Sequence, residues 1–104
     1  MDIQLKRGVL DACVLASLCA EDSYGYKMIK DVSPYVEISE STLYPILKRL
    51  ESAECVSVYS MEHNGRLRKY YHLTDGGRER IAQFIDDWKS INGVYEYIRE
   101  EYNK

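Results

Sequence analysis

The sequence predicts a mainly α-helical fold that carries one small β-hairpin and ends in a long helix. Apolar residues recur at helical spacing near the N-terminus and again after Ser39. The pair Asn64-Gly65 separates two runs of alternating, β-rich residues, which is the pattern of a hairpin with a tight turn. From Ile81 onward the apolar positions follow alternating steps of three and four, which indicates a heptad pattern on one long helix.

The length of 104 residues favours a single domain with a core of modest size. No apolar run approaches the roughly 20 residues that span a bilayer. The N-terminus also lacks the basic segment and cleavage site of a signal peptide. We therefore expect a cytoplasmic protein, in which a second copy covers any large apolar surface left outside the core.

The sequence offers little for metal or redox chemistry. Its three cysteines, Cys13, Cys19 and Cys55, are odd in number and form no CxxC pair, which argues against a disulfide framework and a zinc site. We expect Cys13 and Cys19 as buried small side chains in an apolar helix. His63 and His72 lack a third ligand within reach, so we expect no metal. The chain shows no acid–base pair, activated nucleophile or phosphate-binding glycine loop, so we expect no cofactor and no catalysis.

The net charge of −3 argues against DNA binding, but the charge is unevenly distributed. Residues 1–23 carry two cations and four anions, and residues 75–104 carry five and seven. Residues 24–74 carry seven cations and six anions, and most of these cations fall in two clusters. Since phosphate affinity depends on the local placement of Lys and Arg, the middle segment is the candidate for nucleic-acid binding.

Two helices are predicted in the first third of the chain. The first covers about residues 3–18, and the second covers about residues 24–32 after acidic and hydroxyl capping residues. Pro34 ends the second helix because the residue before a proline disfavours helical geometry. Residues 35–38 form a connector or a short strand. The apolar stripe of the first helix contains Leu5, Val9, Ala12, Leu15 and Leu18, with Val14 and Ala16 beside them.

A third helix begins near Ser39 or Ser41, since serine is a good N-cap at either position. Pro45 favours Ser41, because a residue without an N–H costs least in the first turn of a helix. The residues expected to face the core are Leu43, Ile46, Leu47 and Leu50.

The two strands of the hairpin are predicted over residues 56–60 and 69–73. Thr74 then caps the last helix, and Asp75 is favourable in its first turn because it lies at the positive end of the helix dipole.

This order of elements predicts a winged helix-turn-helix over residues 1–74, followed by a C-terminal dimerisation helix over residues 75–104. In such a domain the third helix enters the major groove of DNA and the basic ribbon follows the phosphate backbone. Hydroxyls and two cations lie on the exposed face of the third helix, and the ribbon tip carries three cations within four positions. The predicted DNA-binding residues are Tyr24, Tyr26, Lys27, Ser39, Ser41, Thr42, Tyr44, Lys48, Arg49, Asn64, Gly65, Arg66, Arg68 and Lys69.

Each of these assignments has a structural alternative. The serines could serve only as caps, and the cations of the third helix could form a solvated face. The ribbon could be a solubilising turn. Strand alternation places Arg68 on the opposite face from Lys69, so not every ribbon residue can touch DNA, and one of the two following tyrosines is expected in the core. The tyrosines that begin the second helix could bind a phosphate or simply pack.

The last helix approaches thirty residues, which is more than a compact domain of this size can cover. A self-complementary two-fold dimer would bury its apolar seam. The predicted dimer interface consists of Leu5, Val9, Ile81, Phe84, Ile85, Trp88, Ile91, Tyr95, Ile98 and Tyr102.

Four motifs occur in a fixed order along the chain: Tyr24-Gly-Tyr26, Ser41-Thr-Leu-Tyr-Pro45, Leu47-Lys-Arg-Leu-Glu51 and Gly65-Arg-Leu-Arg-Lys-Tyr-Tyr-His-Leu-Thr74, with Gly77 after them. In this order and spacing they resemble the PadR family of bacterial transcriptional regulators, in its short form with a single C-terminal helix. The resemblance departs at Cys55, where the family usually has the glycine that ends the third helix. We therefore expect a strained backbone at Cys55 or a different helix end.

The resemblance implies a homodimer that binds an inverted-repeat operator, usually as a repressor. An effector would bind near the interface formed by the first and last helices, and the drug-sensing members bind it in a flat hydrophobic pore between paired tryptophans. Trp88 matches that position, although its heptad spacing also suits simple packing in the dimer seam. Asp11 would favour cationic or hydrogen-bond-donating planar ligands. The expected lining residues are Asp11, Ala12, Leu15, Trp88, Ile91, Asn92 and Tyr95.

The sequence thus favours a dimeric, sequence-specific DNA-binding regulator, and specifically a repressor released by a small molecule at the dimer interface. Two alternatives are a regulator without an effector and a winged-helix module that binds protein instead of DNA. The clustered cations favour DNA. A protein-binding module would instead need an exposed apolar patch on the third helix or the ribbon, where the outward residues are mostly polar.

Overall fold

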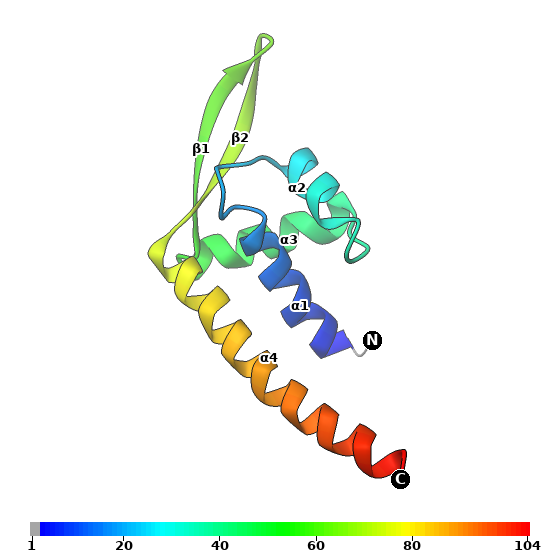
Figure 1. Cartoon of the computed structure of the whole chain (residues 1–104). Helices are drawn as coiled ribbons and strands as arrows, with labels where there is room; N and C mark the ends of the chain where they lie inside the picture. Colours follow the sequence, from blue (N-terminus) through cyan, green and yellow to red (C-terminus); the bar gives the residue numbers. More distant parts are fainter. Residues whose placement is uncertain (1–2) are drawn as a thin grey trace.

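The fold is mainly helical with a single two-stranded antiparallel sheet, as predicted (Figure 1). The computed structural model describes the backbone of residues 3–104 and the side chains from Arg7 onward, so the predicted interface residue Leu5 lies outside the described side chains. No helix in this part of the chain is long and apolar enough to cross a membrane. The elements are α1 (Ile3–Ala16), α2 (Gly25–Val32), α3 (Glu40–Ser52), β1 (Val56–His63), β2 (Arg66–Leu73) and α4 (Asp75–Tyr102).

The core forms where α1, α2, α3 and the base of the hairpin meet. Leucines of α3 are buried here together with Leu15 of α1 and Met28 of α2, and Leu15 has no exposed surface at all. The prediction that Leu15 lines an effector site is therefore wrong, because a side chain closed in by the core cannot contact a ligand. Cys19 is exposed beyond the end of α1, so its predicted burial is also wrong.

The hairpin is longer than the sequence pattern suggested. Its strands pair from Val56 with Leu73 at the base to His63 with Arg66 at the tip. Asn64 and Gly65 both have positive φ, 53° and 79°, which is the two-residue turn that matches the twist of a hairpin. Only the base of the sheet packs on the core, so the polar outer half could not be distinguished from a loop by hydrophobic alternation.

The third helix begins at Glu40, with Ser39 in the N-cap position. The preference for Ser41 as the cap is therefore wrong. Ser41 and Pro45 are both exposed, so the helix can tolerate the proline beyond its first turn because solvent can reach the Ser41 carbonyl that receives no hydrogen bond. The connector over residues 35–38 contains no strand.

At the end of α3 the backbone at Cys55, where the family usually has glycine, is not left-handed. The left-handed residue is Glu54, with φ of 61°. The Cys55 N–H donates to the carbonyl of Leu50 at 2.9 Å and the Glu54 N–H donates to that of Glu51, which is the pattern of a Schellman motif. Cys55 can therefore enter the core in an ordinary conformation, and the strain of a left-handed non-glycine residue falls on Glu54.

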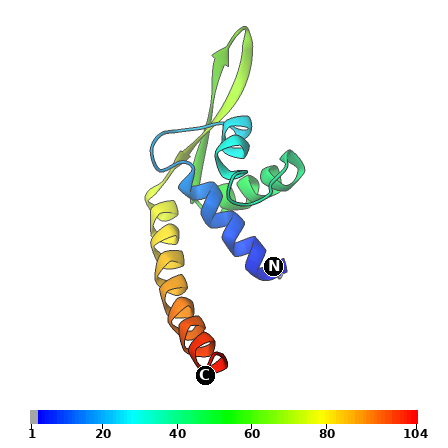
Figure 2. The same cartoon turned by 45° about the vertical axis from the view of Figure 1, so that its right-hand side comes forward.

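Thr74 begins α4 as predicted, since its hydroxyl accepts a hydrogen bond from the Gly77 N–H at 3.1 Å. A side chain at Gly77 would collide with the Cys55 carbonyl and with Leu73, so a glycine lets α4 start tight against the sheet. The helix then runs beyond the rest of the chain, away from the hairpin, in both views (Figures 1 and 2). Its C-terminal half is almost entirely exposed.

Candidate nucleic-acid interface

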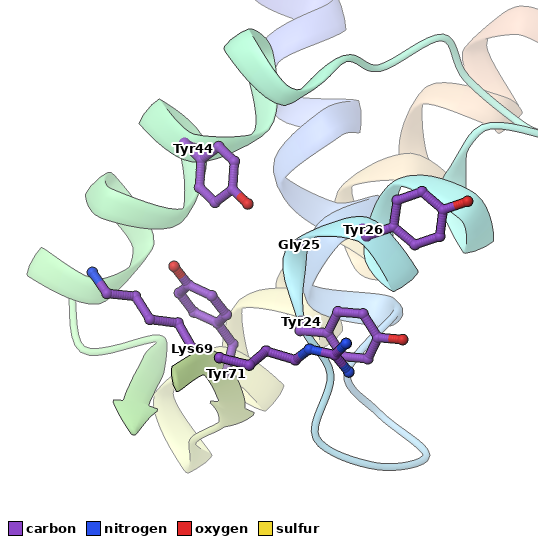
Figure 3. A pocket seen from close by; sticks show the side chains of 7 residues that line it. Tyr24, Gly25, Tyr26, Tyr44, Lys69 and Tyr71 are labelled. Atoms are coloured by element: carbon purple, nitrogen blue, oxygen red, sulfur yellow. The ribbon is translucent and has the colours of Figure 1, made fainter. Parts of the chain in front are cut away.

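A cavity of about 510 Å³ lies where α2, α3 and β2 face one another. Tyr44 of α3 and Tyr71 of β2 point into this space, and Tyr24 and Tyr26 stand at the start of α2 (Figure 3). Sequence positions that are up to 47 residues apart are thus brought to one surface. The lining residues are Tyr24, Gly25, Tyr26, Tyr44, Arg68, Lys69 and Tyr71.

Close packing between α2 and α3 sets the position of Tyr44. A side-chain carbon at Gly25 would lie 2.5 Å from the Tyr44 hydroxyl oxygen, so only glycine allows this approach. Tyr71 closes the floor of the cavity and belongs to the core, and burial raises the pKa of its phenol. Strand alternation predicted that either Tyr70 or Tyr71 lies in the core, and the buried residue is Tyr71.

Arg68 is held in place by aromatic side chains. Its guanidinium carbon lies 4.0 Å from the ring centroid of Tyr24, which is a cation–π contact. Tyr24 meets Tyr70 edge to face at 5.7 Å between centroids, and Tyr70 stacks on Tyr59 at 5.6 Å. This row of rings fixes the wing to the start of α2, so Arg68 has both a structural partner and an accessible charge.

Asp22 ties the loop before α2 to both strands of the wing. The Tyr59 hydroxyl donates to one carboxylate oxygen at 2.6 Å, and His72 Nδ1 lies 2.7 Å from the other. The next residue, Ser23, pairs with Tyr71 as an isolated antiparallel bridge. Together these contacts orient the hairpin relative to α2 and α3.

The hydrogen bonds from Tyr59 and His72 hold the pKa of Asp22 below its ordinary value. Because this pKa is depressed in the folded state, the interaction stabilises the fold above the ordinary carboxylate pKa and is lost as the pH falls through the folded value. Replacing Tyr59 with phenylalanine should raise the Asp22 pKa, as measured from the carboxyl carbon shift by NMR. Tyr70→Phe is the control, since no hydrogen bond joins Tyr70 to Asp22 in the described chain, and an equal rise there would contradict the assignment.

Two cations of α3 take opposite roles, although the sequence placed both on its polar side. Lys48 is exposed and forms no ion pair within the described residues. Arg49 turns toward α1, where its Nη2 atom lies 2.6 Å from Asp11 Oδ1. Arg80 of α4 approaches the other Asp11 oxygen at 3.6 Å. The Arg49 guanidinium therefore neutralises a buried carboxylate, and a phosphate contact from the same side chain, which is 42% exposed, stays a prediction.

The remaining residues predicted to contact DNA are either exposed or already interact with other side chains of the chain. Lys27 forms ion pairs with Asp31 at 3.2 Å and Glu21 at 3.5 Å, and its pKa is raised mainly by the hydrogen bond to Asp31. The hydroxyl of Ser39 lies within hydrogen-bond distance of those of Ser41 and Thr42 and caps no backbone N–H. Asn64, Gly65 and Arg66 lie exposed at the wing tip, away from the cavity.

A second, smaller cavity of about 190 Å³ lies between α1 and residues 80–87 of α4. Of the predicted effector residues, only Asp11 and Ala12 line it within this chain. Asp11 is buried and paired with two arginines, which neutralise its charge, so the prediction that Asp11 favours a cationic ligand is wrong. Trp88 stacks on the lining residue Phe84 at 5.8 Å, while Ile91, Asn92 and Tyr95 lie further along α4.

Sequence reasoning did not identify Asp22, Tyr59 or Tyr70 as parts of this surface. The contacts of Asp22 with Tyr59 and His72 join positions 37 and 50 residues apart, and no local spacing carries such a signal. The register of the hairpin pairs Tyr59 with Tyr70, and residues paired across two strands lie on the same face of the sheet.

Comparison with known proteins gives consistent matches. Residues 14–83 match the model of the Transcriptional regulator PadR-like family. A crystal structure from Streptococcus mutans UA159 is 40% identical with a TM-score of 0.81, over 90% of this chain and 89% of that one. A transcriptional regulator from Clostridium thermocellum is 30% identical with a TM-score of 0.82, over 90% and 96%.

A more distant match is Bacillus subtilis PadR, solved in complex with operator DNA. It is 22% identical with a TM-score of 0.68, and the match covers 74% of this chain and 46% of that one. At this identity the likeness concerns the fold alone. The family match, which spans more than half of the chain, carries the conclusion, together with 32% identity to a PadR family transcription regulator from Clostridium difficile over 85% of this chain and 95% of that one, with a TM-score of 0.77. This chain belongs to the PadR-like family of transcriptional regulators.

Proposed function

We propose that the chain is a sequence-specific DNA-binding regulator that acts as a homodimer. The observation that carries the proposal is the surface on which Tyr24, Tyr44, Arg68 and Lys69 gather around one cavity beside α3. Phenol hydroxyls and cations are the groups that hold phosphates, and α3 presents its exposed side next to them. The distantly similar PadR of Bacillus subtilis was crystallised with operator DNA, which supports DNA as the partner proposed here.

In this proposal α3 enters the major groove and the wing follows the adjacent backbone. Lys48, Tyr44 and Lys69 contact phosphates, and Arg66 at the wing tip reaches into the minor groove. The two α3 helices of a dimer must lie about 34 Å apart to enter successive major grooves, so the operator is an inverted repeat.

The test is a titration of the DNA upstream of this protein's own gene by gel shift and fluorescence anisotropy, at two salt concentrations. We expect binding that is specific for one site and weakens steeply with salt, because phosphate neutralisation releases counterions. Absence of binding even at low salt would refute the DNA-binding function and favour a protein-interaction module.

Removing the two wing cations should weaken binding to all DNA sequences. For Arg68→Ala with Lys69→Ala we expect an affinity loss of about tenfold or more and a salt slope that flattens by roughly one unit per lost phosphate contact. The control is Lys89→Ala with Lys104→Ala, which removes the same charge from α4 and from the residues that follow it. If both double variants lowered affinity equally, the effect would be one of net charge, and the wing would not be the contact.

We further propose that the chain is a repressor released by a planar small molecule bound between the dimerisation helices. Trp88 is 42% exposed in the protomer, and Phe84 joins it to the cavity between α1 and α4. An aromatic pair across the two-fold axis can sandwich a flat ligand. A ligand that favours a different helix spacing would weaken operator binding by as much as it prefers that state.

Fluorescence titration with a panel of planar aromatic compounds tests this, because Trp88 is the sole tryptophan. We expect quenching by at least one compound and release of DNA at the same concentrations. A panel without any quenching would leave Trp88 as a packing residue of the dimer seam and favour a regulator without an effector.

Exposed apolar residues on the wing give the protein-interaction alternative little support. Leu67 and Met61 are 80% and 54% exposed. Leu67 pairs with Glu62 across the strands and Met61 pairs with Arg68. Since adjacent cross-strand pairs point to opposite faces, the two apolar side chains form no continuous patch.

A further inference from the structure

Glu40 is an acid in the first turn of the helix that the proposed function places in the major groove. The helix begins two residues earlier than the Pro45 argument suggested, so Glu40 becomes its first residue and not part of the preceding loop. Its side chain is exposed, and no hydrogen bond or ion pair engages its carboxylate within the described residues. A carboxylate in the first turn interacts favourably with the positive end of the helix dipole, but this interaction does not require the side chain to point in a particular direction.

The two sides of α3 are chemically different. Ser41, Thr42 and Arg49 line a cavity of about 380 Å³ that α3 shares with α1. Glu40 precedes Tyr44 by four residues and therefore lies on the same side of the helix as that tyrosine. Tyr44 lines the cavity shared with α2 and β2. Glu40 is thus an unengaged acceptor on the side of α3 that faces the proposed DNA surface.

A carboxylate on a DNA-facing helix cannot bind phosphate, because both groups are negative. The donors that the major groove offers are the N4 amino group of cytosine and the N6 amino group of adenine. Adenine places its N7 acceptor beside the N6 amino group, which repels a carboxylate, whereas the exposed edge of cytosine offers the donor without an adjacent ring acceptor. The chemistry of Glu40 therefore selects cytosine.

We propose that Glu40 is a specificity-determining residue that accepts a hydrogen bond from the N4 amino group of a cytosine in each half-site of the operator. This inference rests on the DNA-binding function proposed above. It concerns the choice of base at one position, and it leaves the overall affinity to the cations and tyrosines.

The experiment is selection from a random-sequence duplex library, followed by sequencing of the bound pool, for the full-length chain and for Glu40→Gln. We expect a cytosine in each half-site for the wild type, preferred by about tenfold or more over the other bases. Glutamine binds adenine through N6 and N7, so Glu40→Gln should change the preference at this position alone from cytosine to adenine. Glu37→Gln, which removes an equal charge from the loop before α3, should leave the selected sequence unchanged.

The outcomes separate this inference from the proposed function. A wild-type chain that selects no sequence would refute sequence-specific binding, and the role of Glu40 with it. A wild-type chain that selects a motif which Glu40→Gln also selects would leave the regulator intact and overturn the role of Glu40. The same base change in Glu37→Gln would attribute it to charge and overturn the inference as well. Circular dichroism of each variant verifies that α3 remains folded.

Discussion

Replacing Ile91 and Ile98 with aspartate is expected to convert the protein to monomers and to abolish tight operator binding. Both side chains are more than half exposed in the protomer and lie on one side of α4 with Tyr95. Closing an apolar seam over two carboxylates costs several kcal/mol, since each would be buried without a partner. Loss of the second half-site should lower operator affinity by at least about a hundredfold.

Size-exclusion chromatography with light scattering measures the oligomeric state, and anisotropy measures DNA affinity on the same samples. The matched control is Lys89→Asp with Gly93→Asp, which adds two carboxylates on the opposite, exposed side of α4. The control should remain dimeric. An intact dimer with aspartate at positions 91 and 98 would show that the seam lies elsewhere on the chain.

The second large effect is expected at the ion pair between α1 and α3. Asp11 has a side chain only 9% exposed, and Arg49 is its closest cation at 2.6 Å. Arg49→Met would leave the buried carboxylate with Arg80 alone, at 3.6 Å. Removing one partner of a buried pair is strongly destabilising, and because Arg80 partly compensates we expect a loss of about 2–3 kcal/mol in the free energy of unfolding.

Urea denaturation at a fixed protomer concentration measures this loss, because the stability of a dimer depends on concentration. Lys48→Met removes the neighbouring cation, which lacks an ion-pair partner in the described chain, and should change stability by less than about 0.5 kcal/mol. Combining Arg49→Met with Asp11→Asn removes the buried charge and should recover part of the loss. If Arg49→Met instead lowered DNA affinity without destabilising the fold, Arg49 would be a phosphate contact after all.

The elements themselves were predictable because each is encoded by contacts between near neighbours. Helical spacing predicted four helices, Asn64-Gly65 predicted the turn of the hairpin, and Thr74 predicted the start of α4. The heptad residues of α4 from Ile85 onward lie exposed in the protomer, in keeping with a surface that a second copy would cover, whereas Ile81 packs partly against the core of its own chain. These patterns depend on residues close together in the sequence, so they can be interpreted without knowledge of the tertiary fold.

The tertiary structure decided which of several equivalent residues serves which role. Lys48 and Arg49 are adjacent cations on the polar side of α3, and only the packing of α1 against that helix assigns Arg49 to Asp11. The same packing buries Leu15 and neutralises Asp11, which removes both from the predicted ligand site. Glu54 takes the left-handed position because the chain must turn from α3 into β1 there.

The sequence by itself therefore determined the order of helices and strands, the family and the position of the wing, since these depend on local periodicity and turn chemistry. The tertiary structure alone determined the burial of Asp11, the hydrogen bonds by which Asp22 holds the wing and the exposure of Glu40 at the start of α3. Burial and ion pairing join residues that are distant in sequence, and the free energy of such a contact depends on the angle at which two elements pack, which no local pattern records.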